Sequence, residues 1–122
     1  MRHFPGFLKI VKNAKRRIRE TSVAAVQARQ SRARRFALID VREEAEWKKG
    51  RLPGALHLCR GILERDIEAE APDKRAEIVL YCGGGYRSAL AADNLQKMGY
   101  RRVLSMRGGY RAWLAAGGKT VS

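Results

Sequence analysis

A cysteine at the end of an apolar segment is the residue of this 122-residue chain best suited to chemistry. Cys82 closes a β-like run and is followed by Gly83, Gly84 and Gly85, and then by a helix-like segment over residues 88–98. Glycine has no Cβ, so three in a row let the backbone curl and direct successive N–H groups at one point. The N-terminus of the helix adds partial positive charge there. This layout predicts a nucleophilic thiolate at Cys82.

The spacing from the cysteine to the next arginine limits the size of the loop. Arg87 lies five positions after Cys82, which gives C-x4-R, and Tyr86 and Ser88 flank the arginine. Protein tyrosine phosphatases use a C-x5-R loop, one residue longer, to surround a tetrahedral phosphoryl group. The shorter loop makes a smaller cradle, which favours a single sulfur atom. We therefore expect the N–H groups from Gly83 to Ser88 to bind an anionic sulfur.

Length and residue counts exclude several other kinds of site. The chain is long enough for one domain with a modest extension. The chain has only two cysteines and two histidines, Cys59, Cys82, His3 and His57. These are too few for a disulfide scaffold or a closed structural zinc site, so we expect no metal and no cofactor. No apolar run reaches the length of a membrane-spanning helix, and no signal-peptide pattern is present. A soluble, cytoplasmic protein with a reduced thiol is expected.

Positive charge is concentrated near the N-terminus. The formal net charge is +14, and residues 1–35 hold 11 of the 26 Lys and Arg residues against the single acid Glu20. Apolar residues at helical spacing, with basic residues opposite them, predict a basic amphipathic helix over residues 6–20. We expect this helix to pack on the domain with its basic face solvated. Contact of residues 1–35 with an acidic protein, RNA or a membrane surface is the alternative, and a transit peptide is another.

Strand-like and helix-like segments alternate along the rest of the chain. Strands are predicted at residues 36–41, 55–58, 78–81 and 102–105. Helices are predicted from a Thr21 or Ser22 cap to Gln30, at 43–49, 62–69 and 88–98, and from about residue 110, with a polar connector at 31–35. Such alternation implies crossover connections and a parallel sheet, whose ligands gather at the carboxyl ends of the strands. The sequence thus predicts an α/β fold, and Cys82 lies at such a strand end.

Three motifs resemble those of the single-domain rhodaneses, which are sulfurtransferases. Residues 40–58 resemble the family pattern D-V-R-x3-E-[FYW]-x2-G-H-I-x-G-A, residues 81–88 its C-x-x-G-x-R-S loop, and residues 108–113 its closing G-G-x-x-x-W. The motifs occur in the family's order. Arg51 stands where the family usually has histidine, and Cys59 where proline is common. Neither departure removes the sulfur-binding loop.

The resemblance implies a fold and a division of the chain. The fold is the three-layer rhodanese-like one, with a central, mostly parallel sheet of four to five strands flanked by helices and preceded by the amphipathic helix. Residues 1–20 are then a basic helical extension, residues 21–118 the rhodanese-like domain and residues 119–122 a short tail.

The resemblance also implies sulfurtransferase activity of the thiosulfate type. The Cys82 thiolate attacks the outer sulfur of thiosulfate or a persulfide donor and keeps it as a persulfide, which a small thiol, a thioredoxin-like protein or cyanide then accepts. The residues expected to bind the substrate are Gly83, Gly84, Gly85, Tyr86, Arg87 and Ser88. A binding, sensing or sulfur-carrier module that docks a partner through its basic helix is the main alternative. Phosphatase or arsenate-reductase chemistry is another.

Charged residues near the loop have structural interpretations. Arg87 either faces the cradle or, as we favour, braces the loop by pairing with Asp40, because a buried acid needs a partner. Arg42 and Glu46 are four residues apart and are expected to form an ion pair. Asp40 and Arg42 are thus expected to support the loop.

Four further side chains are expected to have mainly structural roles. Trp47 and Trp113 are interpreted as core anchors. His57 is interpreted as a hydrogen-bonded core histidine, since a thiolate stabilised by the loop needs no base. Cys59 is a plain small residue or, if its strand neighbours that of Cys82, a thiol that resolves the persulfide to a disulfide.

Overall fold

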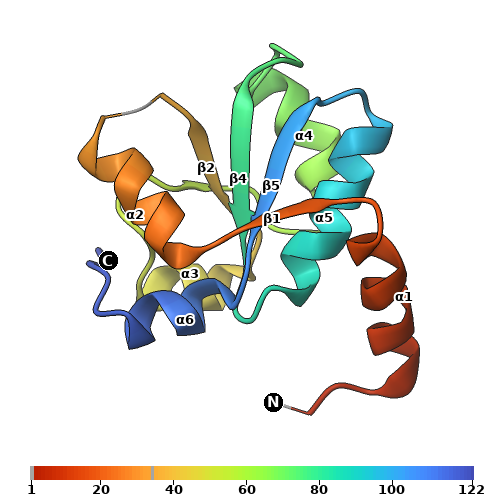
Figure 1. Ribbon diagram of the computed structural model, residues 1–122, viewed down its shortest axis with the longest axis horizontal. Coiled ribbons are helices and arrows are strands. Elements are labelled where there is room, and N and C mark those ends of the chain that lie inside the picture. The colour runs from red at the N-terminus through yellow and green to blue at the C-terminus, as the bar shows by residue number, and fades with distance from the viewer. Residues whose placement is uncertain (1, 34) are drawn as a thin grey trace.

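The computed structural model describes residues 2–33 and 35–122, which form one sheet between two layers of helices (Figure 1). The strands of this part of the chain are β1 (Arg19–Thr21), β2 (Ala37–Asp40), β3 (Leu56–His57), β4 (Glu77–Tyr81) and β5 (Arg102–Met106). The helices are α1 (Pro5–Lys15), α2 (Val23–Ser31), α3 (Glu44–Lys49), α4 (Leu63–Glu70), α5 (Tyr86–Lys97) and α6 (Gly109–Ala115). The strand order is β1-β5-β4-β2-β3, and every neighbouring pair is parallel. The predicted α/β fold is confirmed.

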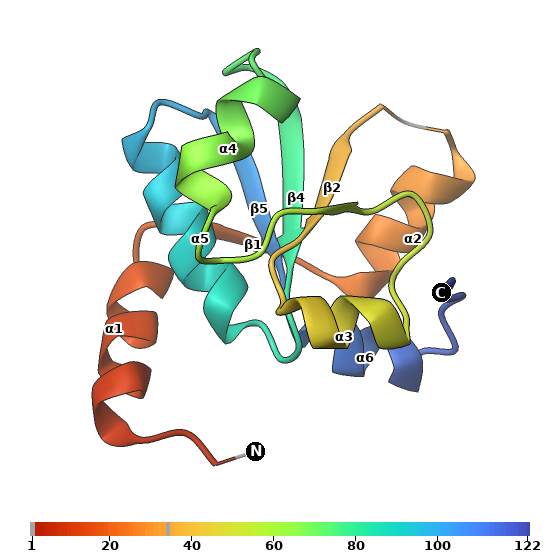
Figure 2. The same ribbon diagram turned by 180° about the vertical axis from the view of Figure 1, so that it is seen from behind.

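The central strand β4 is buried along its whole length and divides the core into two halves. Its side chains alternate between the two faces of the sheet, as strand geometry requires. Ile78 and Leu80 pack with side chains of α4 and α5, which cover one face (Figure 2). Val79 and Tyr81 pack on the other face with α2 and with Trp113 of α6. Burial on both faces explains why the sequence of β4 is almost continuously apolar.

The helix predicted over residues 6–20 is wrong at its C-terminal end. α1 ends at Lys15, and residues 19–21 form β1 instead, with Arg19 opposite Leu104 and Thr21 opposite Met106 of β5. Pairing with the exposed edge of β5 overrides the helical pattern, which a local reading cannot detect. The predicted cap of the next helix is Ser22, whose Oγ accepts the Ala25 N–H at 3.1 Å. Thr21, the other predicted cap, belongs to the strand.

α1 packs against α5 on the outside of one helix layer (Figures 1 and 2). Its buried face contains Val11 and Ala14. Just beyond the helix, the Arg17 guanidinium donates to both carboxylate oxygens of Asp93 in α5, at 2.9 and 2.7 Å. Gln96 Nε2 also donates to Arg17 O at 2.8 Å. The extension therefore packs on the domain, as expected, with most of its lysines and arginines exposed.

The last residues of the chain contact the domain at two points. Trp113 Nε1 donates to Lys119 O at 2.8 Å, and Val121 forms an antiparallel bridge with Arg51.

The other predicted helices and strands differ from the observed ones by a few residues at their ends. In the described part of the chain, no helix combines the length and the apolar character that crossing a membrane requires.

Candidate active site

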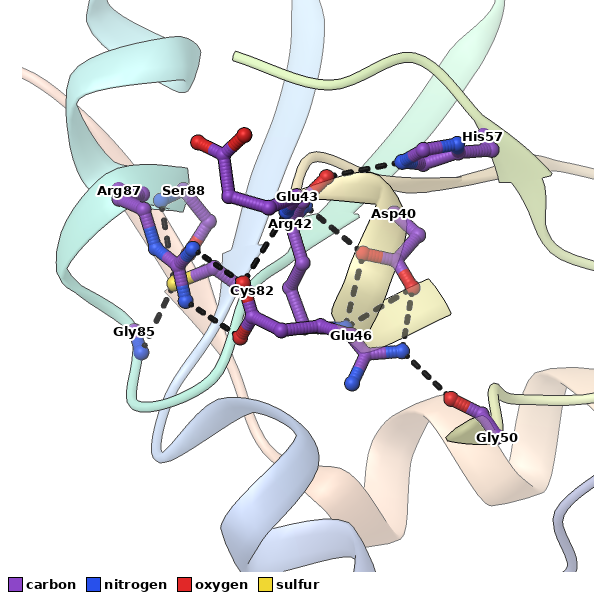
Figure 3. A network of polar contacts seen from close by, with 10 residues as sticks. All are labelled: Asp40, Arg42, Glu43, Glu46, Gly50, His57, Cys82, Gly85, Arg87 and Ser88. Carbon is purple, nitrogen blue, oxygen red and sulfur yellow. Dashed lines mark hydrogen bonds and ion pairs between the residues drawn. The ribbon is translucent and has the colours of Figure 1, made fainter. Parts of the chain in front are cut away.

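The Cys82 sulfur lies in a cradle of backbone N–H groups at the carboxyl end of β4 (Figure 3). The Gly85 N–H donates to Sγ at 3.1 Å and the Ser88 N–H at 3.3 Å. Gly85 has φ +95°, a left-handed conformation that turns the chain into α5. Gly83 and Gly84 line the pocket around the sulfur rather than donating to it. The loop thus directs two donors at Sγ, an arrangement that stabilises negative charge on sulfur.

Two buried hydroxyl groups extend the polar contacts of the sulfur. Cys82 Sγ lies 3.5 Å from Ser88 Oγ, which lies 2.8 Å from Ser105 Oγ. A thiol donates its proton to Ser88 Oγ, whereas a thiolate accepts the Ser88 hydroxyl proton, and the serine pair can reverse its direction to suit. Sequence reasoning missed Ser105. The pairing of β4 with β5 is the feature that could have identified it. In the parallel register Ser105 lies opposite Leu80, two residues before Cys82.

The N-terminus of α6 holds the loop from the side opposite α5. The Tyr110 N–H donates to Cys82 O at 2.7 Å, and the Arg111 N–H donates to Gly83 O at 3.1 Å. Gly109 has φ +57°, and a Cβ at this position would overlap Cys82 O. The glycine pair that begins the third motif therefore lets the helix approach the backbone of the loop.

The two predicted ion pairs are wrong because the partners are exchanged. Arg87 Nη1 and Nη2 donate to Glu46 Oε1 and Oε2, at 2.7 and 3.0 Å. Asp40 is instead occupied by Arg42, whose backbone N–H and Nε both reach Asp40 Oδ1, at 2.9 and 3.0 Å. Arg42 follows so closely after Asp40 that the pair forms at the end of one strand. Glu46, on α3, is left free to face the loop (Figure 3).

The Glu46–Arg87 contact joins α3 to the residue that follows the glycine loop, and it uses a different acid from the one expected. Its hydrogen bonds lower the pKa of Glu46 below the ordinary range and raise the pKa of Arg87. Both side chains are partly exposed and line the pocket beside the sulfur. The predicted pairing of Arg87 with Asp40 is therefore wrong, and the bracing of the loop by Arg87 stays a prediction.

Arg42 joins three segments beneath the loop. Its Nη2 donates to Asp40 Oδ2 and to Gly50 O, both at 2.7 Å, and its guanidinium lies 4.1 Å from the centre of the Tyr110 ring. Burial lowers the pKa of Arg42, but the hydrogen bonds and charge of Asp40 outweigh burial, so the pKa lies above its ordinary value. The pair ties the ends of β2 and α3 to α6, which in turn holds the loop.

His57 and the two tryptophans differ in burial. Trp113 is buried and anchors the core, as predicted. Trp47 is only partly buried, so the core prediction is wrong for it: its ring stacks on His57 at 4.7 Å, and the Arg51 guanidinium lies 4.2 Å from its centre. His57 Nε2 is 2.8 Å from Arg42 O, which confirms the predicted hydrogen bond, although the side chain is half-buried.

The condition for a resolving cysteine is not met. Cys59 follows β3, and β2 lies between β3 and β4, which carries Cys82. Both cysteines are free thiols, Cys59 partly buried and Cys82 buried. The plain small-residue interpretation of Cys59 is the one that this topology favours.

A pocket of about 370 Å³ opens beside the sulfur. Its wall combines the loop with α3, α6 and the N-terminal segment, through His3, Phe7, Glu43, Glu46, Cys82, Gly83, Gly84, Tyr86, Arg87 and Arg111. We call it the Cys82 pocket. Sequence reasoning missed His3 and Phe7, which reach the site only because α1 folds back along α5.

The comparison with protein families identifies one family. Its model, described as the Rhodanese-like domain, matches residues 22–116. A sulfurtransferase of Allochromatium vinosum is 40% identical over 80 residues, which are 66% of this chain and 73% of that protein. The thiosulfate sulfurtransferase GlpE of Coxiella burnetii is 30% identical over a segment that covers 67% of this chain and 75% of GlpE.

Two further proteins show how the similarity extends. YrkF of Bacillus subtilis, named as a sulfur carrier protein, is 32% identical over 79% of this chain, which spans about half (51%) of YrkF. A solved structure from Rhodopseudomonas palustris, of unknown function and described there as a possible tyrosine phosphatase, is 32% identical with a TM-score of 0.84. That similarity covers 99% of this chain and 98% of the other, so it includes α1. On its motifs, fold and family match, the chain belongs to the rhodanese-like domain family.

Proposed function

We propose that this protein is a sulfurtransferase that carries a sulfane sulfur as a persulfide on Cys82. The observation that supports this most is the cradle itself, in which the N–H groups of Gly85 and Ser88 point at Sγ at 3.1 and 3.3 Å. Donors fixed in this way stabilise an anionic sulfur without reorganising during the reaction. The relatives named as sulfurtransferases or as a sulfur carrier support the same chemistry.

The reaction needs only the thiolate, a donor and an acceptor. The Cys82 thiolate attacks the outer sulfur of thiosulfate, the bond from that sulfur to the sulfonate breaks, and sulfite leaves with the electron pair. An acceptor thiolate then attacks the outer sulfur of the persulfide and returns Cys82 to the thiolate. Thiosulfate is the proposed donor because a cradle of N–H groups suits a small anion and because GlpE is named for this donor.

The loop argues against phosphatase chemistry. The spacing from Cys82 to Arg87 is one residue shorter than the phosphatase spacing, and the Arg87 guanidinium is engaged by both oxygens of Glu46. An arginine held by a carboxylate is less available for a second oxyanion. We therefore place sulfur transfer ahead of phosphoryl transfer for this site.

Intact mass spectrometry tests the proposal directly. Incubation with thiosulfate is expected to add one sulfur atom to the wild-type chain, and a thiol acceptor is expected to remove it. The Cys82→Ser variant should gain nothing, while the matched Cys59→Ser variant should gain the sulfur as the wild type does. Absence of the adduct with thiosulfate and with persulfide donors would contradict the proposal.

A partner-docking role is the second candidate, favoured by a basic groove between α1 and α5. The groove has a volume of about 570 Å³, and its cationic side chains are Lys9, Lys12, Arg16, Arg17, Arg60 and Lys97. Asp93, the one acid among the described residues of its wall, is bound by Arg17. An acidic protein, RNA or an anionic membrane surface would each fit such a groove. Binding to any of them should weaken steeply with added salt.

A further inference from the structure

Aromatic rings from the N-terminal segment form one wall of the Cys82 pocket. The His3 ring meets the Tyr86 ring edge-on, with centroids 4.4 Å apart. Phe7 lies 5.3 Å from His3 and 6.2 Å from Tyr86, again as ring centroids. All three residues line the same pocket as Cys82. We call this group of three rings the aromatic wall.

The aromatic wall is held in place by the packing of α1. Val11 and Ala14 are buried against the domain, and Arg17 is bound to Asp93 just beyond the helix. Tyr86 is the first residue of α5, so the wall and the sulfur loop share a helix. In both ribbon views the N-terminal end of α1 lies at the same end of the sheet as the β4–α5 loop (Figures 1 and 2). The rings are therefore part of a built surface beside the sulfur.

The pocket is larger than inorganic sulfur chemistry requires. Cys82 is buried to 1% exposure, so a partner must enter the pocket to reach Sγ. The volume of about 370 Å³ corresponds to roughly a dozen water molecules, more space than a small oxyanion such as thiosulfate fills. The pocket also has charged lining residues, Glu43, Glu46, Arg87 and Arg111. On the side formed by the aromatic wall, the space favours an apolar group, because such a group leaves water when it enters.

We propose that His3 and Phe7, with Tyr86, are specificity-determining residues that select thiol acceptors with an apolar or aromatic group beside the sulfur. This inference rests on the proposed persulfide at Cys82. In the transfer step the acceptor thiolate forms a bond to the outer sulfur, and the bond from that sulfur to Cys82 Sγ breaks. Sγ keeps the electron pair, so the products are an organic persulfide and the Cys82 thiolate. No oxidant or further reactant is needed.

A pair of acceptors that differ in one group tests the selection. Protein loaded with sulfur is mixed with 2-phenylethanethiol or with 2-mercaptoethanol, and the loss of the sulfur is followed by intact mass. The wild type is expected to react about fivefold faster with the aromatic thiol, the size of one favourable ring contact. The His3→Ala/Phe7→Ala variant should lose this preference. Leu8→Ala, an exposed change on the same helix, should keep it.

A second measurement separates the aromatic wall from sulfur transfer itself. Cys82 is alkylated with N-benzyliodoacetamide or with iodoacetamide, and the ratio of the two rates is compared between wild type and the double variant. The same preference and the same loss are expected, whether or not Cys82 accepts sulfur. If the protein takes no sulfur but the alkylation ratio changes as expected, the proposed function fails and the selecting surface stands.

The inference would be overturned if the wild type reacted equally fast with the two thiols. It would also be overturned if the double variant kept the preference for the aromatic thiol. The double variant must be folded for this comparison, which its circular dichroism spectrum establishes. The single His3→Ala variant serves if the double variant is unfolded, because His3 precedes α1 and supports no helical turn. Phe7→Leu, which keeps apolar area at the same place, should retain part of the preference.

Discussion

Two arginine–carboxylate pairs flank the sulfur loop, and solvent reaches only one of them. The floor pair, Asp40–Arg42, lies beneath the loop with side-chain exposures of 0% and 4%. The rim pair, Glu46–Arg87, lines the Cys82 pocket with exposures of 37% and 30%. Each pair has at least two hydrogen bonds, so geometry alone does not distinguish them.

Burial gives the two pairs different roles. Removing one member of a buried pair leaves the other charge without water, which is far more costly than removing one member of a solvated pair. The floor pair also binds Gly50 O and contacts Tyr110, so it connects three segments of the fold. Among the described residues, the rim pair connects two segments, α3 through Glu46 and the start of α5 through Arg87. Stability should therefore depend on the floor pair, and the conformation of the loop on the rim pair.

The largest effect is expected from Arg42→Leu. The change leaves the Asp40 carboxylate buried without its partner and should lower the free energy of unfolding by about 3–5 kcal/mol. Urea denaturation measures the loss. The Asp40→Asn/Arg42→Leu variant should recover part of it because no buried charge remains. A loss below about 1 kcal/mol would remove the distinction between floor and rim.

An uncharged buried contact separates the effect of burial from that of charge. Ser105→Ala removes one partner of the 2.8 Å bond to Ser88 Oγ and should lower the free energy of unfolding by about 1 kcal/mol. The double-mutant cycle with Ser88→Ala should show a coupling between the two serines. If the effects of the two changes simply add, the hydroxyl pair is not a functional unit.

A smaller loss of stability is expected at the rim. Glu46→Gln should lower the free energy of unfolding by about 0.5 kcal/mol, as for other partly solvated pairs. It should also slow the loading of sulfur from thiosulfate, because Arg87 then loses its charged partner and one of its two hydrogen bonds to α3. Glu44→Gln is the matched control on the same helix, since the Glu44–Lys48 pair is highly exposed. Equal loading rates for the two variants would show that the rim pair does not affect the loop.

The smallest effect is the dependence of the rim pair on pH. Arg87 lowers the pKa of Glu46 below its ordinary 4.5, so the pair contributes its full stability above about pH 4.5. That contribution is lost as the pH falls through the lowered pKa of the folded state. The difference in stability between wild type and Glu46→Gln should therefore be constant from neutral pH to about 5 and shrink in more acidic solution. A difference that grows on acidification would contradict this assignment.

Local patterns predicted the parts of the site that local chemistry determines. The cysteine, the glycines and the helix after them follow one another in the chain, and their geometry depends on backbone freedom and helix polarity. Four of the five strands were equally readable, and β4 most clearly, because it is buried on both faces and therefore apolar throughout. The Ser22 cap is also local, because its side chain accepts a hydrogen bond from Ala25, three residues later in the chain.

Contacts between distant segments were not readable in the same way. Asp40 and Glu46 are both plausible partners of an arginine, and only the direction in which α3 leaves β2 decides between them. β1 forms because β5 offers an unpaired edge, which overrides the helical pattern around residues 19–21. The aromatic wall joins residues 3 and 86, which no spacing rule connects.

The three-residue strand β1 also protects the molecule from its own edge. Without β1, one side of β5 would present unpaired N–H and C=O groups, which is the template on which extended chains associate. A version of the chain that began at the family match, residue 22, would keep Cys82 and its loop but lose this cover. Such a shortened protein should self-associate more readily at high concentration, and the extension would then matter for solubility as well as for the pocket.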